Sequence, residues 1–341
     1  MTLIFLLSFI AILALILFLI KRRTNGPLNS NKKDLTGKLI IITGSSDGIG
    51  FEAAKDLLNS NAKVIFACRN KTKTEGKINE LPEKLRKNAV FVQLDLQKFK
   101  SIENFVKEIK SNYPKIDILI NNAGMSSTIL NKTEDGYLNT FQVNYLSTVL
   151  LTLLLFDHFN ENESKIINLS SILHKNSKLT YGDSKYLNNY DLMEKLYKEE
   201  RNKTFDAYSD SKLLVLYFTQ YLADYCEKKC PYLKVVCLHP GVILTKIFNM
   251  EKLFLKIVFS IIKPILYCFA KDVVHGAQTT LFLSYSDNKD LVSGGYYDNL
   301  KLEKCSLKGK DEKLRNELVN ETLNILKSKY NELEKFPLLS N

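Results

Sequence analysis

The sequence predicts an α/β fold: a single doubly wound domain built on a parallel sheet and preceded by a transmembrane helix. Short β-branched runs alternate with longer amphipathic stretches, and residues 2–20 contain no charge. Hydrophobic residues make up 45% of the 341 positions and charged residues 25%. These fractions are typical of a folded globular chain and exclude a disordered, collagen-like or low-complexity protein.

Residues 1–20 predict a transmembrane signal anchor. The nineteen uncharged residues 2–20 would reach roughly 28 Å as a helix, close to the ~30 Å thickness of the hydrocarbon layer. The basic cluster Lys21, Arg22 and Arg23 follows the apolar run, whereas a cleaved signal peptide carries its positive charge in front. Because positive charge stays on the cytoplasmic side, we expect a single-pass protein of the endoplasmic reticulum membrane with its large part facing the cytosol.

Two further divisions follow along the chain. Residues 21–36 mix Gly, Pro, Asn, Ser and charge without periodicity, which predicts a basic flexible tether. Residues 37–341 predict one domain, because apolar runs separated by helical segments are typical of a parallel sheet covered on both faces. The expected strands are LIIIT at 39–43, KVIFAC at 63–68, VFVQLD at 90–95, IDILIN at 116–121, KIINLS at 165–170 and LKVVCL at 233–238.

Two later stretches stand outside the alternation. Residues 251–270 are strongly apolar but are interrupted by Lys256, Lys263 and Pro264, so we expect a helix at the membrane interface or over an apolar pocket. Near the C-terminus, apolar residues on a background of Lys and Glu predict an amphipathic helix. Its apolar residues are Leu314, Leu318, Ile325 and Leu326.

The net charge of +11 admits three partners: nucleic acid, an anionic membrane surface or a phosphorylated cofactor. No nucleic-acid recognition module is present and the basic residues are dispersed, so we expect no nucleic-acid partner. The six cysteines are few and irregularly spaced, which favours a reducing compartment. Cys226 and Cys230 lack a second ligand pair nearby, so no metal site is predicted.

A glycine-rich loop follows the first expected strand. In TGSSDGIG at 43–50, Gly44, Gly48 and Gly50 allow a tight turn and a close approach of backbone to a pyrophosphate at the start of the next helix. Ser46 and Ile49 lie in the same loop. The position between a first strand and a first helix predicts a dinucleotide site.

The end of the second strand indicates which dinucleotide. NAD sites place an Asp or Glu there to bind the ribose 2′-hydroxyl, but this chain has Arg69 and no carboxylate. A guanidinium suits a 2′-phosphate, so the sequence favours NADP(H) over NAD(H).

With these motifs the chain resembles the short-chain dehydrogenase/reductase family over almost all of residues 37–300, and the resemblance implies a Rossmann fold. TGSSDGIG is similar to the family's cofactor loop, and Asp95 to the residue that meets the adenine. The resemblance implies further cofactor contacts at Asn122, Ala123, Gly124, Pro240, Gly241 and Thr245, and a catalytic tetrad of Asn144, Ser171, Tyr208 and Lys212, of which Tyr208 and Lys212 also meet the cofactor.

The tetrad has its own chemical logic. Hydride transfer between a nicotinamide and a carbonyl needs a matched proton transfer at the oxygen. A phenol with a pKa near 10 is a poor base at neutral pH. We expect Lys212, four residues after Tyr208 on the same helix face, to lower the Tyr208 pKa and to hold the nicotinamide ribose. Ser171 would hydrogen-bond the substrate oxygen, and by resemblance Asn144 holds a water in a proton relay.

The spacing Tyr-x-x-x-Lys occurs twice, at Tyr181–Lys185 and at Tyr208–Lys212. An amphipathic helix that leads to the sixth strand follows Lys212, whereas a charged, Asn-rich stretch follows Lys185. We therefore assign the catalytic role to Tyr208 and interpret residues 172–205 as an enlarged loop near the substrate mouth.

A longer gap before the tyrosine, an N-terminal anchor and the NADP preference resemble the microsomal retinol dehydrogenase group. The similarity rests on ACRN at 67–70, NLSSILH at 168–174, AYSDSKLL at 207–214, HPGVILT at 239–245, GAQTTLFLS at 276–284 and SGGYYDN at 293–299. It implies a hydrophobic alcohol or carbonyl substrate, retinol and retinal first. A steroid or fatty-aldehyde reductase, a non-catalytic dinucleotide-binding membrane adaptor, the direction of reaction and assembly as a homodimer all stay open.

Overall fold

Eight strands form one sheet at the centre of the computed structural model, which describes residues 2–127, 129–243 and 267–336. The sheet order is β3-β2-β1-β4-β5-β6-β7-β8, and every neighbouring pair is parallel except the antiparallel pair β7 and β8. The strands are β1 Leu39–Thr43, β2 Lys63–Cys68, β3 Ala89–Gln93, β4 Ile118–Asn121, β5 Ser164–Leu169, β6 Leu233–His239, β7 Tyr296–Asp298 and β8 Lys301–Glu303.

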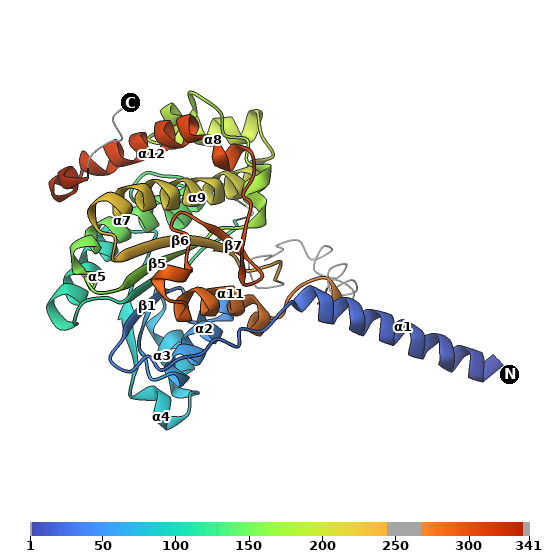
Figure 1. The fold of residues 1–341 in the computed structure, drawn as a ribbon. Helices are drawn as coiled ribbons and strands as arrows, with labels where there is room; N and C mark the ends of the chain where they lie inside the picture. The colour runs from blue at the N-terminus through green and yellow to red at the C-terminus, as the bar shows by residue number, and fades with distance from the viewer. Residues whose placement is uncertain (1, 128, 244–266, 337–341) are drawn as a thin grey trace.

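Helices cover both faces of this sheet (Figure 1), as the doubly wound prediction requires. On one face α2 and α11 build a core with the sheet, and on the other α5, α7 and α9 do so, with α12 packed outside α9. The longer helices are α1 Thr2–Asn25, α2 Gly48–Asn59, α3 Lys71–Asn79, α4 Glu83–Arg86, α5 Phe99–Asn112, α7 Ser147–Leu154, α8 Tyr190–Glu199, α9 Lys203–Lys229, α11 Val273–Tyr285 and α12 Glu312–Lys327. The short ones are α6 Asn139–Phe141, η1 Gln142–Leu146, η2 Phe156–His158, η3 Ile172–Asn176, η4 Asp183–Tyr186, η6 Asn288–Asp290, η7 Lys308–Lys310 and η8 Asn331–Lys335.

The six predicted strands are confirmed within two residues at each end. Their burial explains the agreement: all five residues of β1 and all six of β5 are buried, as in a parallel sheet covered on both faces. The sequence did not predict β7 and β8, because strands of three residues carry too little periodicity to be distinguished from a turn.

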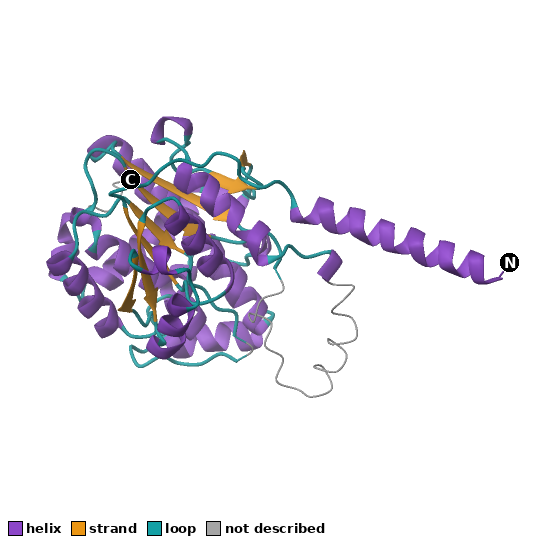
Figure 2. Cartoon of the chain, turned by 90° about the horizontal axis from the view of Figure 1, so that it is seen from below, coloured by secondary structure: helices purple, strands orange, loops and turns teal. Residues whose placement is uncertain are grey.

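At the N-terminus, helix α1 covers the predicted anchor and extends away from the body of the molecule (Figures 1 and 2). Among the helices of the described residues, none combines the length and apolar character that crossing a membrane requires, so the predicted spanning helix is not confirmed.

The segment 21–36 differs from the flexible tether we predicted. Residues 21–25 continue α1, and the Lys21 ammonium donates to the Tyr267 carbonyl at 2.9 Å. The Asn25 amide donates to the Asp272 carboxylate at 3.0 Å. Leu35 is buried in the core. Polar residues without periodicity can still be held by contacts with a distant part of the chain, and here that part is the start of α11.

The two late stretches have different outcomes. Of the apolar stretch 251–270, residues 251–266 lie outside the described residues. The C-terminal amphipathic helix is present as α12, and its apolar side is buried against α9. Leu314, Leu318, Ile325 and Leu326 are all buried.

Candidate active site

The predicted site residues gather at the carboxyl ends of the parallel strands. The chain enters the sheet at β1, runs outward through β2 to β3, and then returns to the other side of β1 at β4. The loops after β1 and β4 therefore leave in opposite directions, and a crevice between such loops is where open α/β sheets bind ligands.

The glycine loop after β1 packs directly on the loop after β4. Gly44 has a φ of +67°, and a Cβ added there would lie 2.9 Å from the Ala123 Cα. A Cβ on Gly50 would lie 2.5 Å from the Asn122 amide nitrogen. That amide donates to the Thr43 carbonyl at 2.8 Å, and the Ala123 N–H donates to the Thr43 hydroxyl at 2.9 Å. The two loops are therefore packed into one cradle. A side chain at Gly44 or Gly50 would collide with the loop after β4.

This cradle fits a nicotinamide dinucleotide. Gly48 has a φ of +58° and begins α2, whose first backbone N–H groups can bind a pyrophosphate. Ser46 and Ile49 are half-buried beside it. Asp47, which was not among the predicted site residues, caps α2 through the Gly48 N–H and forms an ion pair with Lys73 at 2.9 Å.

The groups expected to meet the adenosine part follow β2 and β3. Arg69 is exposed, and among the described residues nothing forms a hydrogen bond or an ion pair with its guanidinium. Asp95 is half-buried and its carboxylate accepts a hydrogen bond from the Gln97 N–H at 3.0 Å. Arg69 is therefore open to a phosphate, whereas Asp95 sits in a turn that its own side chain stabilises.

Asn144 lies in η1, a π-helical turn between α6 and α7. Such turns are rare and occur frequently at functional sites. Its side chain accepts from the Met125 N–H at 2.7 Å and donates to the Met125 carbonyl at 2.9 Å and the Ser211 hydroxyl at 3.0 Å. Asn144 thus joins the loop after β4, where Gly124 lies, to helix α9.

Ser171 follows β5 and is held by two buried histidines. The His174 ring nitrogen Nδ1 lies 2.7 Å from the Ser171 carbonyl, and the Ile172 N–H donates to the His239 ring at 3.2 Å. Burial lowers the pKa of His239 to about 3 and also lowers that of His174, so both rings are neutral at pH 7. Sequence reasoning missed this role, although His174 and His239 both stand in the quoted motifs.

Tyr208 and Lys212 meet Ser171 from the first turns of α9. The Ser171 side chain lies near Tyr208 and acts to lower the Tyr208 pKa. The Lys212 ammonium donates to the Leu169 carbonyl at 2.8 Å and lies 5.7 Å from the centre of the Tyr208 ring. A Cβ on Gly124 would lie 3.2 Å from the same ammonium. The structure therefore brings Asn144, Ser171, Tyr208 and Lys212 together beside the cradle.

The expected pKa of Tyr208 needs correction. Burial raises the pKa of Tyr208, and the nearby Ser171 side chain offsets this only in part. Burial also lowers the pKa of Lys212, to about 8. The Lys212 ammonium is bound to a backbone carbonyl and is not bonded to the phenol oxygen, so it does not activate the phenol in the free protein.

The second Tyr-x-x-x-Lys spacing lies elsewhere. Tyr181 is 53% exposed and its hydroxyl donates to the carboxylate of Asp311, the residue that caps α12. Lys185 is exposed and lies 4.9 Å from the Tyr186 ring centre. Neither residue reaches the Ser171 loop.

The loop after β6 begins with Pro240 and Gly241. Pro240 and Gly241 are partly buried, and Gly241 has a φ of +94°. A Cβ on Gly241 would lie 2.5 Å from the Lys271 side chain, which the sequence analysis did not single out. Thr245 lies outside the described residues.

Comparison with known proteins agrees with this geometry. A family model described as short chain dehydrogenase matches residues 38–186. Retinol dehydrogenase 12 of Mus musculus is 32% identical over 326 residues, which cover 95% of this chain and 97% of the mouse protein. The chain belongs to the short-chain dehydrogenase family. Retinol dehydrogenase 14 of Homo sapiens is 33% identical over 299 residues, 83% of this chain and 84% of the human one. This dehydrogenase thus resembles the retinol dehydrogenase group, as its motifs predicted.

Solved structures of the family share the fold of this dehydrogenase. An uncharacterized protein from Mycobacterium paratuberculosis has a TM-score of 0.69 at 23% identity and covers 89% of this chain and 98% of its own. Salutaridine reductase from Papaver somniferum has a TM-score of 0.56 at 22% identity. The match covers 76% of this chain and 99% of the reductase. The predicted α/β fold is confirmed, and the chain is an oxidoreductase by family.

Proposed function

We propose that this protein interconverts a hydrophobic alcohol and its aldehyde or ketone with NADP(H), retinol and retinal being the first substrates to test. One observation carries the proposal: the buried Lys212 ammonium lies 5.7 Å from the centre of the Tyr208 ring, next to Gly124 of the glycine cradle and bonded to the carbonyl of Leu169, two residues before Ser171. The names of the relatives support the choice of retinoids.

Each of these side chains has a task at the substrate oxygen. When bound, the cofactor supplies or accepts the hydride at the carbinol carbon. Ser171 donates a hydrogen bond to the oxygen as negative charge develops on it. Tyr208 delivers the proton to that oxygen in reduction and removes it in oxidation. Asn144 holds the backbone of Met125 and the Ser211 hydroxyl in place for proton return from solvent.

The state of Tyr208 favours reduction. Because burial raises its pKa above the usual value near 10, the phenol is protonated at neutral pH and can donate. Oxidation needs the phenolate of Tyr208. The phenolate forms only at higher pH, or when the Lys212 ammonium stabilises it in the complex with the cofactor. We therefore expect carbonyl reduction to be the faster direction near pH 7.

The NADP preference is proposed from Arg69. Its exposed guanidinium has no partner in the described part of the chain, and the neighbouring negative charge of Asp47 is compensated by Lys73. Replacing Arg69 by Asp should weaken NADPH binding far more than NADH binding, because only NADPH carries the 2′-phosphate. Binding is read from the change in NADPH or NADH fluorescence as each cofactor is titrated with protein, and equal losses for both would contradict the proposal.

Attachment to a membrane is proposed from helix α1. Large apolar side chains are exposed along it, and Phe5, Phe9 and Phe18 are each more than 60% exposed. Exposed apolar surface of this extent is typical of a membrane or protein contact. Sealed microsomes test both membrane attachment and orientation. Added protease should digest the domain if the domain faces the cytosol. A domain that resists digestion would lie in the lumen, which would reverse the predicted orientation.

A panel of substrates distinguishes a retinal reductase from a steroid or aldehyde reductase and from a non-catalytic protein. The purified protein is incubated with NADPH and with retinal, steroid ketones or medium-chain aldehydes, and NADPH consumption is followed at 340 nm. Preferential turnover of retinal supports the proposal, and preference for steroids or aldehydes would assign a different substrate to the same site. Absence of turnover with bound NADPH would instead identify a non-catalytic dinucleotide-binding membrane adaptor.

A further inference from the structure

Asp210 lies inside the active-site motif, halfway between Tyr208 and Lys212 on α9. Two positions along a helix correspond to a rotation of about 200°, so the Asp210 side chain leaves the face opposite to Tyr208 and Lys212. It is almost completely buried, with 1% of its surface exposed.

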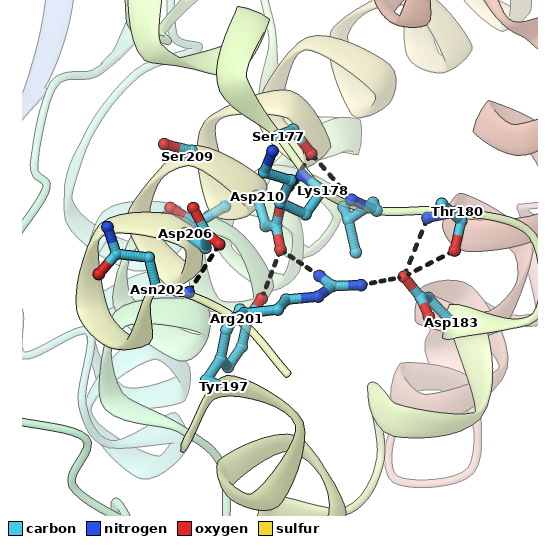
Figure 3. A network of polar contacts seen from close by, with 12 residues as sticks. Ser177, Lys178, Thr180, Asp183, Tyr197, Arg201, Asn202, Asp206, Ser209 and Asp210 are labelled. Carbon is cyan, nitrogen blue, oxygen red and sulfur yellow. Dashed lines mark hydrogen bonds and ion pairs between the residues drawn. The ribbon is translucent and has the colours of Figure 1, made fainter. Parts of the chain in front are cut away.

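Four donors surround the Asp210 carboxylate, and all of them come from the enlarged segment 172–205 (Figure 3). The Ser177 hydroxyl and the Lys178 N–H donate to Oδ1 at 2.6 and 2.7 Å. The Tyr197 hydroxyl and the Arg201 guanidinium donate to Oδ2 at 2.9 and 2.6 Å. Hydrogen bonds to a buried carboxylate, one of them from a cation, are among the strongest in proteins.

Arg201 also connects this cluster to a second carboxylate. Its other terminal nitrogen lies 2.5 Å from Asp183, which accepts a hydrogen bond from the Thr180 N–H at 2.9 Å (Figure 3). The Arg201 side chain is 8% exposed. One guanidinium therefore fixes both the beginning and the end of the enlarged segment to the back of α9.

We propose that Arg201 is a positioning residue: through Asp210 it fixes the first turns of α9 and so the place of Tyr208 relative to Ser171. The inference deepens the proposed function and rests on it for the role of Tyr208. Without Arg201, Asp210 would lose the only cation that the described residues place in an ion pair with it, and the start of α9 would shift to bring the buried charge toward water.

The chain offers a control on the same helix. The Arg315 side chain on α12 is 9% exposed and pairs at 2.9 Å with Asp224 of α9, whose side chain is 44% exposed. Asp224 lies twelve residues beyond Lys212. Arg201→Met and Arg315→Met therefore each remove one buried guanidinium from α9, the first beside Tyr208 and the second far from it.

Two measurements test the inference. Amide hydrogen exchange over residues 203–212 should quicken in Arg201→Met and not in Arg315→Met. The kcat for carbonyl reduction should fall in Arg201→Met on the order of 100-fold, the cost of a reacting group displaced by about 1 Å, while KM for NADPH stays near the wild-type value. Arg315→Met should keep the wild-type kcat.

A double variant separates positioning from general destabilisation. Arg201→Met with Asp210→Asn removes the unbalanced charge, so it should regain most of the kcat and the slow exchange that Arg201→Met alone has lost. Equal losses in the two methionine variants, or no recovery in the double variant, would overturn the inference. If the wild-type protein itself shows no turnover, the proposed function fails, and hydrogen exchange still decides the role of Arg201.

Discussion

The segments Tyr181–Lys185 and Tyr208–Lys212 carry the same residue types at the same spacing, yet they have different surroundings. Tyr208 and Lys212 lie in the continuous helix α9, where residues four apart share a face. Tyr181 precedes the 3₁₀ turn η4, where three residues make a turn and the fourth moves to another face. Only in α9 do the tyrosine and the lysine lie on one helix face beside the end of a strand.

Electrostatics separates the two tyrosines further. Burial raises the pKa of Tyr208, and the nearby Ser171 side chain acts against that rise. The hydrogen bond to the Asp311 carboxylate raises the pKa of Tyr181, because an anion beside a phenol disfavours phenolate. Only Tyr208 has a neighbouring hydroxyl through which a proton can be shared with substrate.

The largest difference is expected on removing the two hydroxyls. Tyr208→Phe should lower kcat by about 10²- to 10⁴-fold, the usual contribution of a general acid, with NADPH binding nearly unchanged. Tyr181→Phe should leave kcat at the wild-type value. Steady-state kinetics and fluorescence titration measure both quantities, and loss of turnover in Tyr181→Phe alone would transfer the catalytic role to that segment.

The two lysines should differ next. Lys212→Met removes the only ammonium that the described residues place beside the Tyr208 ring and should reduce kcat/KM by about 10²-fold, as for other buried electrostatic groups. Lys185→Met, which removes an exposed charge, should have no effect on turnover. Comparable kcat/KM values for the two variants would show that position in the fold does not distinguish them.

A pH titration gives a smaller effect. Burial lowers the pKa of Lys212 to about 8. The side chain is therefore almost fully protonated below pH 7, and it loses its positive charge as the pH rises through 8. NADPH binding to the free protein should therefore weaken by roughly tenfold between pH 7 and pH 9. Lys185→Met should retain this dependence and Lys212→Met should lose it. A titration that is flat in the wild type would refute the assignment.

The smallest effect is expected on stability at the exposed tyrosine. Tyr181→Phe removes hydrogen bonds to Asp311 from a solvated position, so the melting temperature should fall by no more than about 1–2 °C. Calorimetry of wild type and variant measures the difference. A much larger fall would mean that the contact between the enlarged segment and α12 is a main source of stability.

Much of the cofactor cradle was predictable because its function depends on local backbone conformation. Gly44 and Gly48 need a positive φ, and Gly50 needs the absence of a Cβ, so residue type and order along the chain were sufficient signals. The strand ends that place Ser171 and Asn122 were equally readable from apolar runs. The histidines that hold Ser171 were not, since a buried histidine has no characteristic spacing.

The segment 21–36 and the enlarged segment show the opposite case. Polar composition predicted flexibility for residues 21–36, but contacts with Tyr267, Asp272 and the core at Leu35 fix them. In the enlarged segment, tertiary structure buries the Arg201 guanidinium between the carboxylates of Asp183 and Asp210.

The sequence by itself predicted the six longer strands with the helices between them, the glycine loop and the family, because hydrophobic period and backbone freedom are local properties. Only the tertiary structure decided which charges are buried together, that Arg201 binds the back of the catalytic helix, and that the pKa of Tyr208 rises. Burial and ion pairing depend on groups far apart in the chain, and their distances are set only when the sheet and its helices have packed.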